Sequence, residues 1–158
     1  MQYHLTMRAY VLDTDVLVAA VRSDAGASRL ILRAALAGRF ELLLSVPLML
    51  EYEAVLSRPE HLEVSGASIH DVRDLLDGLA SVGKPVRLAF RWRPALPDPN
   101  DDMVLETAIN GRAHGIVTFN ERDFNPIAAR FGCRVMRPGE FLLLLAGEGR
   151  DPGREEEQ

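Results

Sequence analysis

Short apolar runs alternate along the chain with longer segments in which apolar residues recur at helical spacing. Such short runs are typical of strands buried in a parallel sheet, and they occupy 10–12, 40–44, 86–90, 116–119 and 134–136. The helical spacing covers 28–37, about 46–57, 69–82, 102 to about 111, 126–131 and 139–146. This alternation predicts a three-layer α/β/α fold with a central parallel sheet, of the Rossmann-like type.

The composition is that of one ordinary domain. A chain of 158 residues is long enough for a single hydrophobic core. We expect the domain to span 9–146, after an N-terminal extension at 1–8 and before a Gly-rich, charged and disordered tail at 147–158. No apolar run approaches the roughly 18–20 residues of a membrane span, and the N-terminus lacks a signal-peptide pattern, so we expect a cytoplasmic protein. The single cysteine, Cys133, is expected to be a small buried hydrophobe.

Two aspartates stand where the first apolar run ends. Asp13 and Asp15 interrupt the stretch AYVLDTDVLVAA, which is apolar on both sides of them. A carboxylate at the end of a buried strand is costly unless it is paired, hydrogen-bonded or bound to a metal, and ligands of open α/β sheets bind at this edge. The pair therefore indicates a site, although an N-cap of the following helix would explain one of the two.

Further carboxylates stand at comparable places in the predicted fold. They are Glu51 in a predicted helix, the group from Asp98 to Asp102 ahead of another helix, and Asp123 after the fourth strand. Strand ends and the helix starts that follow them share one edge of a parallel sheet, so these acids can converge.

Helical geometry at about 100° per residue selects among neighbouring acids. The apolar direction of the helix after the proline loop lies roughly 10° from Asp101 and roughly 90° from Asp102, which favours Asp101. On the earlier helix Glu51 lies about 85° from the apolar direction and Glu53 about 115° from it, which favours Glu51 slightly.

Several carboxylates in one place predict a divalent metal ion. Without a cation they would raise one another's pKa and destabilise the fold. Mg²⁺ or Mn²⁺ prefers oxygen ligands, whereas zinc would need a His or Cys cluster that four scattered histidines and one cysteine do not offer. Such an ion suits phosphoryl transfer, because it lowers the pKa of a bound water and stabilises charge on phosphate oxygens.

In this order and spacing, four motifs resemble the PIN domain of metal-dependent ribonucleases, especially the toxin components of bacterial toxin–antitoxin pairs. The motifs are VLDTDVLVAA, LMLEYEAVLSRP, DPNDDMVLETAINGRAHGIVTFNERDF and RVMRPGEFL. The resemblance implies two sets of site residues: the acidic metal ligands Asp13, Glu51, Asp101 and Asp123, and the polar neighbours Thr118 and Asn120.

Two positions depart from the family pattern. Asp15 stands where the family usually has Asn, which adds a candidate ligand or substrate-positioning group. Asn120 stands where many relatives have Asp, which leaves Asp123 to supply the fourth acid. The resemblance further implies an RNA substrate cut to leave a 5′-phosphate, a Mg²⁺ or Mn²⁺ cofactor, a homodimer or larger assembly, and a cognate antitoxin that covers the active edge.

Two other interpretations stay open. The sequence DTDVL after a hydrophobic strand also resembles haloacid-dehalogenase-like phosphatases, in which Asp13 would be the covalent nucleophile and Asp15 the general acid. Against this, Asp101 and Asp102 follow a proline-rich loop, whereas the last acids of that family follow a strand. The other interpretation is a PIN-like module that binds RNA or protein with weak or no catalysis, which Asn120 keeps open.

The charge distribution does not decide among these functions. The net charge of −5 gives no overall sign of nucleic-acid binding. One local cluster suits either phosphate binding with base stacking or an edge strand with solvated arginines. Its members are Arg87, Phe90, Arg91, Trp92 and Arg93.

Overall fold

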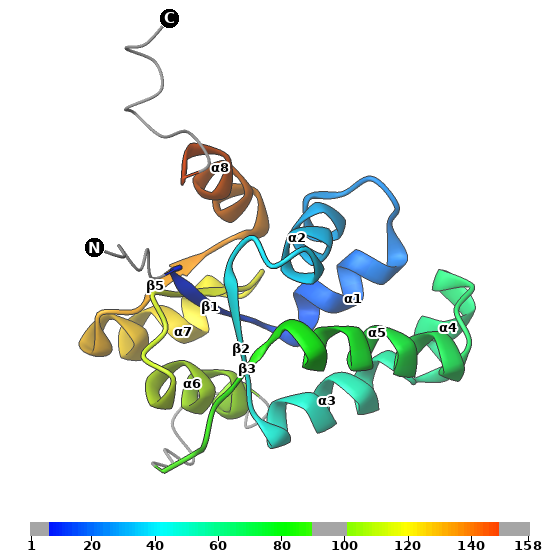
Figure 1. The fold of residues 1–158 in the computed structure, drawn as a ribbon, viewed down its shortest axis with the longest axis horizontal. Coiled ribbons are helices and arrows are strands. Elements are labelled where there is room, and N and C mark those ends of the chain that lie inside the picture. The colour runs from blue at the N-terminus through cyan, green and yellow to red at the C-terminus, as the bar shows by residue number, and fades with distance from the viewer. Residues whose placement is uncertain (1–6, 90–100, 149–158) are drawn as a thin grey trace, which may run out of the picture.

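A computed structural model describes residues 7–89 and 101–148 of the chain. Five parallel strands form one sheet in the order β3-β2-β1-β4-β5, with β1 at its centre (Figure 1). The strands are β1 Ala9–Leu12, β2 Glu41–Leu44, β3 Lys84–Pro85, β4 Gly115–Val117 and β5 Arg134–Met136.

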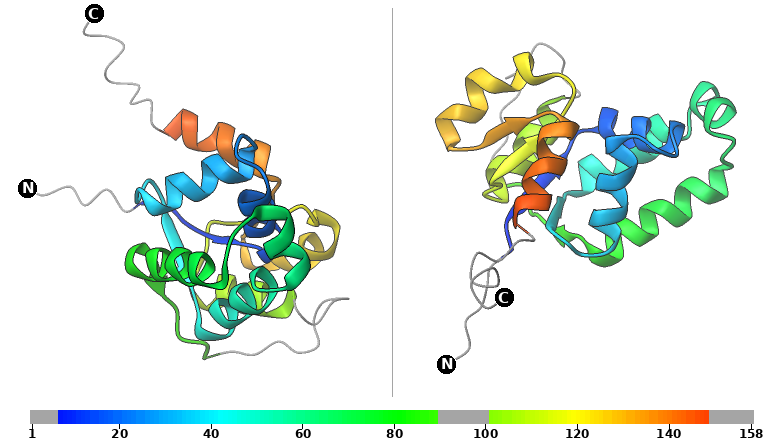
Figure 2. Two further views of the ribbon diagram at one scale, coloured as in Figure 1. Left: turned by 90° about the vertical axis from the view of Figure 1, so that its right-hand side faces the viewer. Right: turned by 90° about the horizontal axis from the view of Figure 1, so that it is seen from above.

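Helices cover the sheet and connect its strands. They are α1 Thr14–Arg22, α2 Ala27–Leu36, α3 Val46–Leu56, α4 Pro59–Ser65, α5 Ile69–Val82, α6 Asp101–Asn110, α7 Glu121–Ala128, the 3₁₀ helix η1 Ala129–Phe131, and α8 Pro138–Glu148. Helices α2 and α8 pack together on one side of β1, and α3 and α6 contact each other on the other side (Figure 1). Figure 2 shows α4 and α7 at opposite ends of the molecule. These layers confirm the predicted α/β/α fold class.

The strand order reverses between β1 and β4. From β1 the chain continues to β2 on one side, and it later returns to β4 on the opposite side of β1. In open parallel sheets, ligands bind outside the carboxyl ends of the strands at such a switch point. Asp13 directly follows β1 and Thr118 directly follows β4, so both lie where the topology favours a site.

An aromatic cluster packs the last helix onto the sheet. Tyr10 of β1, Phe40 and Phe141 of α8 are buried and meet edge to face, with ring centroids 4.6 to 5.9 Å apart. Cys133 is buried as predicted, and burial raises the pKa of its thiol to about 11. Among the described residues, no helix is long and apolar enough to cross a membrane.

Three elements differ from the sequence prediction. Pro59 ends α3 but also opens α4, which the pattern did not predict, because proline suits a first helical turn. Helix α7 begins at Glu121 and holds Pro126 inside it, whereas the pattern predicted a start at Pro126. Strand β3 pairs two residues earlier than expected, and beyond it the Val86 N–H donates to the Leu44 carbonyl at 2.7 Å.

The predicted terminal segments are described only in part. Arg8 precedes β1 and its carbonyl accepts from the Glu41 N–H at 3.1 Å. Gly147 and Glu148, which were predicted to begin the tail, belong to α8. Residues 1–6, 90–100 and 149–158 lie outside the described residues, and with them most of the predicted basic and aromatic cluster.

Candidate active site

Asp13 joins the end of β1 to the start of α1. Its backbone N–H donates to the Val117 carbonyl of β4 at 2.9 Å, which continues the strand pairing by one residue. One carboxylate oxygen caps α1 by accepting from the Thr14 N–H at 2.7 Å, and the other accepts from the Thr118 hydroxyl at 2.7 Å. Asp13 is only 5% exposed. The capping role considered for one of the two aspartates is therefore real for Asp13.

The loop after β4 is tied to the same two aspartates. The Thr118 hydroxyl, besides donating to Asp13, accepts from the Asn120 N–H at 2.9 Å. The Phe119 N–H donates to one oxygen of Asp15 at 3.1 Å. The other oxygen of Asp15 is buried and accepts no hydrogen bond from a described residue. Two strand ends that are a hundred residues apart are thus joined by short polar contacts.

These residues open onto a pocket of about 350 Å³ at the carboxyl edge of the sheet. Its walls come from α1, from the second half of α3 and from the starts of α4, α6 and α7. The lining residues are Asp13, Thr14, Asp15, Val18, Glu51, Val55, Arg58, Asp101 and Asn120. Three of the four acids predicted as metal ligands, together with Asp15, therefore share one cavity.

Helices α3 and α6 carry Glu51 and Asp101 into this pocket. Ser45 caps α3 by accepting from the Leu48 N–H at 3.3 Å, and its hydroxyl lies 2.6 Å from the hydroxyl of Thr107 on α6. The Tyr52 hydroxyl donates to the Leu12 carbonyl, which fixes α3 to the end of β1. Buried hydrogen bonds thus hold the two acid-bearing helices relative to the strand that leads into Asp13.

Asp102 of α6 is more buried than its helical angle predicted. The angle placed Asp102 to the side of the buried stripe, yet Asp102 is 1% exposed, whereas Asp101 lines the pocket. Asp102 is buried because α6 is covered on more than one side, by strands β1, β2 and β4 and by α3. Glu106, one turn after Asp102, is buried as well.

Asp123 does not line the pocket. It lies in the first turn of α7, and its carboxylate accepts from the Asn120 side-chain amide at 2.6 Å. Asn120 does line the pocket. Asp123 is thus linked to the pocket by its hydrogen bond with Asn120.

Burial, more than the crowding of acids, raises the pKa of two carboxyl groups in this pocket. Burial, and after it the negative charge of Asp15, raises the pKa of Asp13 from 3.8 to about 7, against the hydrogen bonds from Thr118 and Thr14. Burial and the charge of Asp101 raise the pKa of Asp15. Burial, followed by the charge of Asp13, raises the pKa of the Tyr52 hydroxyl well above its usual value. A pocket in which carboxylates resist ionisation favours a cation as its ligand.

The donor set fits a hard divalent cation that keeps part of its water shell. All four acids of the pocket offer oxygen, and Asp15 has one oxygen with no hydrogen-bond partner in the described part of the chain. Among the described residues, no group of three or more His, Cys, Asp or Glu side chains is arranged so that it could hold a metal ion. Mg²⁺ usually retains several waters and binds only one or two carboxylates directly, so an open arrangement of this kind suits it.

Arg58 is a pocket residue that the sequence analysis passed over. It stands between α3 and α4, and the following Pro59 favours the extended backbone that Arg58 adopts, with φ −61° and ψ 137°. Its side chain lines the acidic pocket, yet it forms no ion pair with any residue in the described ranges. The one available signal was the position of the Arg-Pro pair, which follows closely after the end of the helix that carries Glu51.

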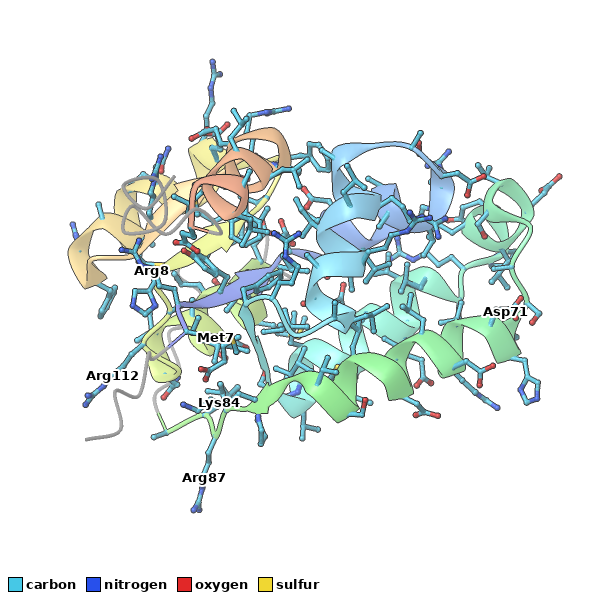
Figure 3. The ribbon with its side chains drawn as sticks, turned by 45° about the horizontal axis from the view of Figure 1, so that its top comes forward. Met7, Arg8, Asp71, Lys84, Arg87 and Arg112 are labelled. Carbon is cyan, nitrogen blue, oxygen red and sulfur yellow. The ribbon has the colours of Figure 1, made fainter. Side chains whose placement is uncertain are left out.

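The described part of the predicted basic cluster lies away from this pocket. Arg87 is exposed, and in Figure 3 its side chain points away from the fold. The Ala89 N–H donates at 2.9 Å to the side chain of Asn110, at the end of α6 opposite Asp101. Among the described residues, Arg58 is therefore the cationic side chain that lines the pocket.

Of the comparisons with known proteins, one identifies a family and another a similar fold. A family model described as the PIN domain matches residues 9–122, a segment that contains Asp13, Glu51 and Asp101 and ends one residue before Asp123. The chain is similar to one chain in the crystal structure of VapBC2 from Rickettsia felis bound to a DNA fragment from their promoter. The TM-score is 0.56 at 15% sequence identity, over 82% of this chain and 98% of that one. A comparison with curated proteins found no match.

Proposed function

This chain belongs to the PIN domain family, and on that premise we propose that it is a Mg²⁺- or Mn²⁺-dependent ribonuclease. The observation that carries the proposal is the pocket at the β1/β4 switch point, into which Asp13, Asp15, Glu51 and Asp101 converge from three separate parts of the chain. Family membership also disfavours the phosphatase interpretation, in which Asp13 would be a covalent nucleophile.

Asp13, Glu51 and Asp101 are proposed to hold the ion, with Asp15 as a further oxygen donor or substrate-positioning group. When bound, the ion would supply an activated water and positive charge for phosphate oxygens. Thr118 orients Asp13 through its hydroxyl and receives the Asn120 N–H, so it fixes the loop at the pocket rim. Asp123 acts through Asn120 in this proposal, because its carboxylate accepts from the Asn120 amide.

Arg58 is proposed to bind a phosphate of the RNA. A phosphodiester entering a pocket lined by four acids needs a positive group, and guanidinium donors suit phosphate oxygens. Within the described part of the chain Arg58 has no ion pair that a bound phosphate would have to replace. Arg58→Gln should weaken RNA binding and leave thermal stability unchanged.

We further propose that the protein is the toxin of a toxin–antitoxin pair, with a cognate antitoxin as its partner. Similarity to a chain of the VapBC2 structure supports this proposal at the level of fold. A homodimer or larger assembly and a cytoplasmic location, where cellular RNA is found, complete it. Size-exclusion chromatography with light scattering measures the assembly, and co-expression with the adjacent reading frame tests the partner.

The test of the nuclease is metal-dependent RNA cleavage by purified protein. Wild type should degrade single-stranded RNA with Mg²⁺ or Mn²⁺ and stop when EDTA is added, and Asp13→Asn and Asp101→Asn should each lose the activity. Asp74→Asn, on the exposed side of α5, is the matched control and should cut as wild type does.

Three other outcomes would contradict the proposal. Cleavage that survives both substitutions would place the nuclease site elsewhere or reveal a contaminant. Hydrolysis of small phosphoesters alone would restore the phosphatase interpretation. RNA binding without cleavage under any metal would identify the binding module that Asn120 keeps open.

A further inference from the structure

A second pocket, of about 320 Å³, adjoins the acidic one. Residues that are neighbours in the chain line the two cavities. Asn120 lines the acidic pocket and Phe119 lines the second one. On α1, Val18 lines the acidic pocket and Ala19 lines the second one. The Phe119 N–H also donates to Asp15, which lines the acidic pocket. The two cavities therefore lie on either side of the same loop and of the same part of α1.

Phe119 presents an aromatic ring to the second pocket. The ring is 39% exposed, although it belongs to a short loop at the edge of the core. Arg137 holds it in place: the guanidinium lies 5.6 Å from the ring centroid and donates to the Phe119 carbonyl at 3.1 Å. Arg137 is itself held by an ion pair to Glu121 at 3.7 Å. The ring is thus exposed and preorganised at the same time.

The remaining walls leave room and offer polar groups. Most are small residues of α1, α2 and the start of α8, and no acid is among them, in contrast to the neighbouring cavity. Ser28 lines the pocket and is only 4% exposed, so it places a hydroxyl group in the wall. A volume near the lower end of the usual range for ligand pockets, about 300–1,000 Å³, suits one small planar group.

We propose that this second pocket binds a nucleobase of the RNA, stacked on Phe119, while the adjoining phosphate lies in the acidic pocket. Every base has a π-face, so an exposed ring beside a cation binds bases with little regard to sequence. The Ser28 hydroxyl is available to the edge of the bound base. The inference rests on the proposed ribonuclease function and adds the groups that hold the substrate beside the reacting phosphate.

The test measures RNA binding in EDTA, so that cleavage does not interfere. The probe is a short, unstructured, uridine-rich RNA carrying 2-aminopurine at one position, and probes with the label at successive positions are compared. Wild type should quench the fluorophore at one position, because a stacked 2-aminopurine loses fluorescence. Phe119→Leu keeps an apolar side chain without the ring, and it should abolish this quenching and raise the Kd about 5- to 150-fold, the range of base–aromatic stacking. Phe119→Tyr should restore both.

Two further variants separate stacking from general damage. Phe131→Leu changes a ring of similar exposure, 41%, that does not line the pocket, and it should bind as wild type does. A Cβ at Gly139, which lines the pocket, would meet no atom within 4 Å, so we expect Gly139→Leu to be accommodated and to narrow the pocket. It should weaken binding as Phe119→Leu does and leave the melting temperature unchanged.

An abasic scan completes the experiment. An RNA that lacks the base at the quenched position should bind wild type as weakly as intact RNA binds Phe119→Leu, and combining both changes should add no further loss. The proposed base-binding pocket would be overturned if the losses of affinity were additive at every position, or if Phe119→Leu and Phe131→Leu bound RNA equally well. In either case, RNA cleavage by wild type would still support the proposed nuclease. Wild type that neither binds nor cuts RNA would overturn the proposed function and this inference with it.

Discussion

The charge of Asp13 should make the folded protein less stable at neutral and alkaline pH than a neutral side chain would. Burial and the neighbouring Asp15 raise its pKa from 3.8 to about 7, so the folded state holds a proton that the unfolded chain releases. The stabilisation from this proton is complete below pH 3.8 and is lost as the pH rises through about 7. Asp13→Asn removes the ionisation and should therefore be more stable than wild type at pH 8.

The magnitude follows from the size of the shift. A shift from 3.8 to about 7 corresponds to about 4 kcal/mol at most. An amide at position 13 can still accept from Thr14 but cannot accept from the Thr118 hydroxyl as the carboxylate does, and a lost buried hydrogen bond costs about 1 kcal/mol. We expect a net gain of roughly 1–3 kcal/mol at pH 8, falling to zero or below as the pH approaches 4.

Urea unfolding of both proteins at a series of pH values in EDTA measures this difference. Asp74→Asn, a substitution on the exposed side of α5, controls for the loss of one negative charge from the whole chain. A difference between Asp13→Asn and wild type that does not change with pH would refute the reasoning. So would an Asp13→Asn protein that is less stable than wild type at pH 8.

Three further predictions concern the frame of the site. Ser45→Ala removes the cap of α3 and its contact with α6, so it should lower the free energy of unfolding by about 1–2 kcal/mol and also lower activity. Its control is Ser68→Ala, which removes an exposed cap of α5. This control should lower the free energy of unfolding in urea by about 1 kcal/mol without affecting activity. A Cβ at Gly115 would lie 2.8 Å from the Arg134 carbonyl, so Gly115→Ala should cost about 1–3 kcal/mol in urea; equal stability of wild type and variant would contradict this. Mg²⁺ should raise the melting temperature of wild type at pH 8 and raise it less in Asp15→Asn, and equal shifts would remove Asp15 from the ion site.

The layout of the fold and the edge that holds the acids could be predicted from sequence, because both depend on regular patterns. Short apolar runs alternating with helical spacing specify a parallel sheet, and acids that follow such runs must lie at its carboxyl edge. Asp13 was predicted in this way, whereas Asp101 was chosen by its helical angle and Glu51 by a slight angular preference and the family resemblance; all three line one pocket. The resemblance to the PIN domain family then predicted the reaction and its substrate, which periodicity alone did not predict.

Features that depend on packing from several sides could not be predicted. A helical angle identifies one buried direction, but α6 is covered by strands and by α3, so Asp102 is buried on a face that the angle left open. Asp123 was treated as part of a strand end, and the start of α7 at Glu121 instead turns it toward Asn120. Arg58 and Phe119 belong to connections whose side chains follow no period, so only coordinates could place them in pockets.

The cap of α1 explains why the fold needs an oxygen at position 13 but does not explain a charge there. Asn or Ser caps a helix about as well as Asp does, and either would avoid ionisation at a position that is 5% exposed and beside Asp15. The two hydrogen bonds to Asp13, from Thr14 and Thr118, lower its pKa without overcoming burial. A cation in the pocket would reverse this balance, because it favours the ionised carboxylates of Asp13, Asp15 and Asp101 together. The charge at position 13 therefore supports the proposal that this pocket binds a cation.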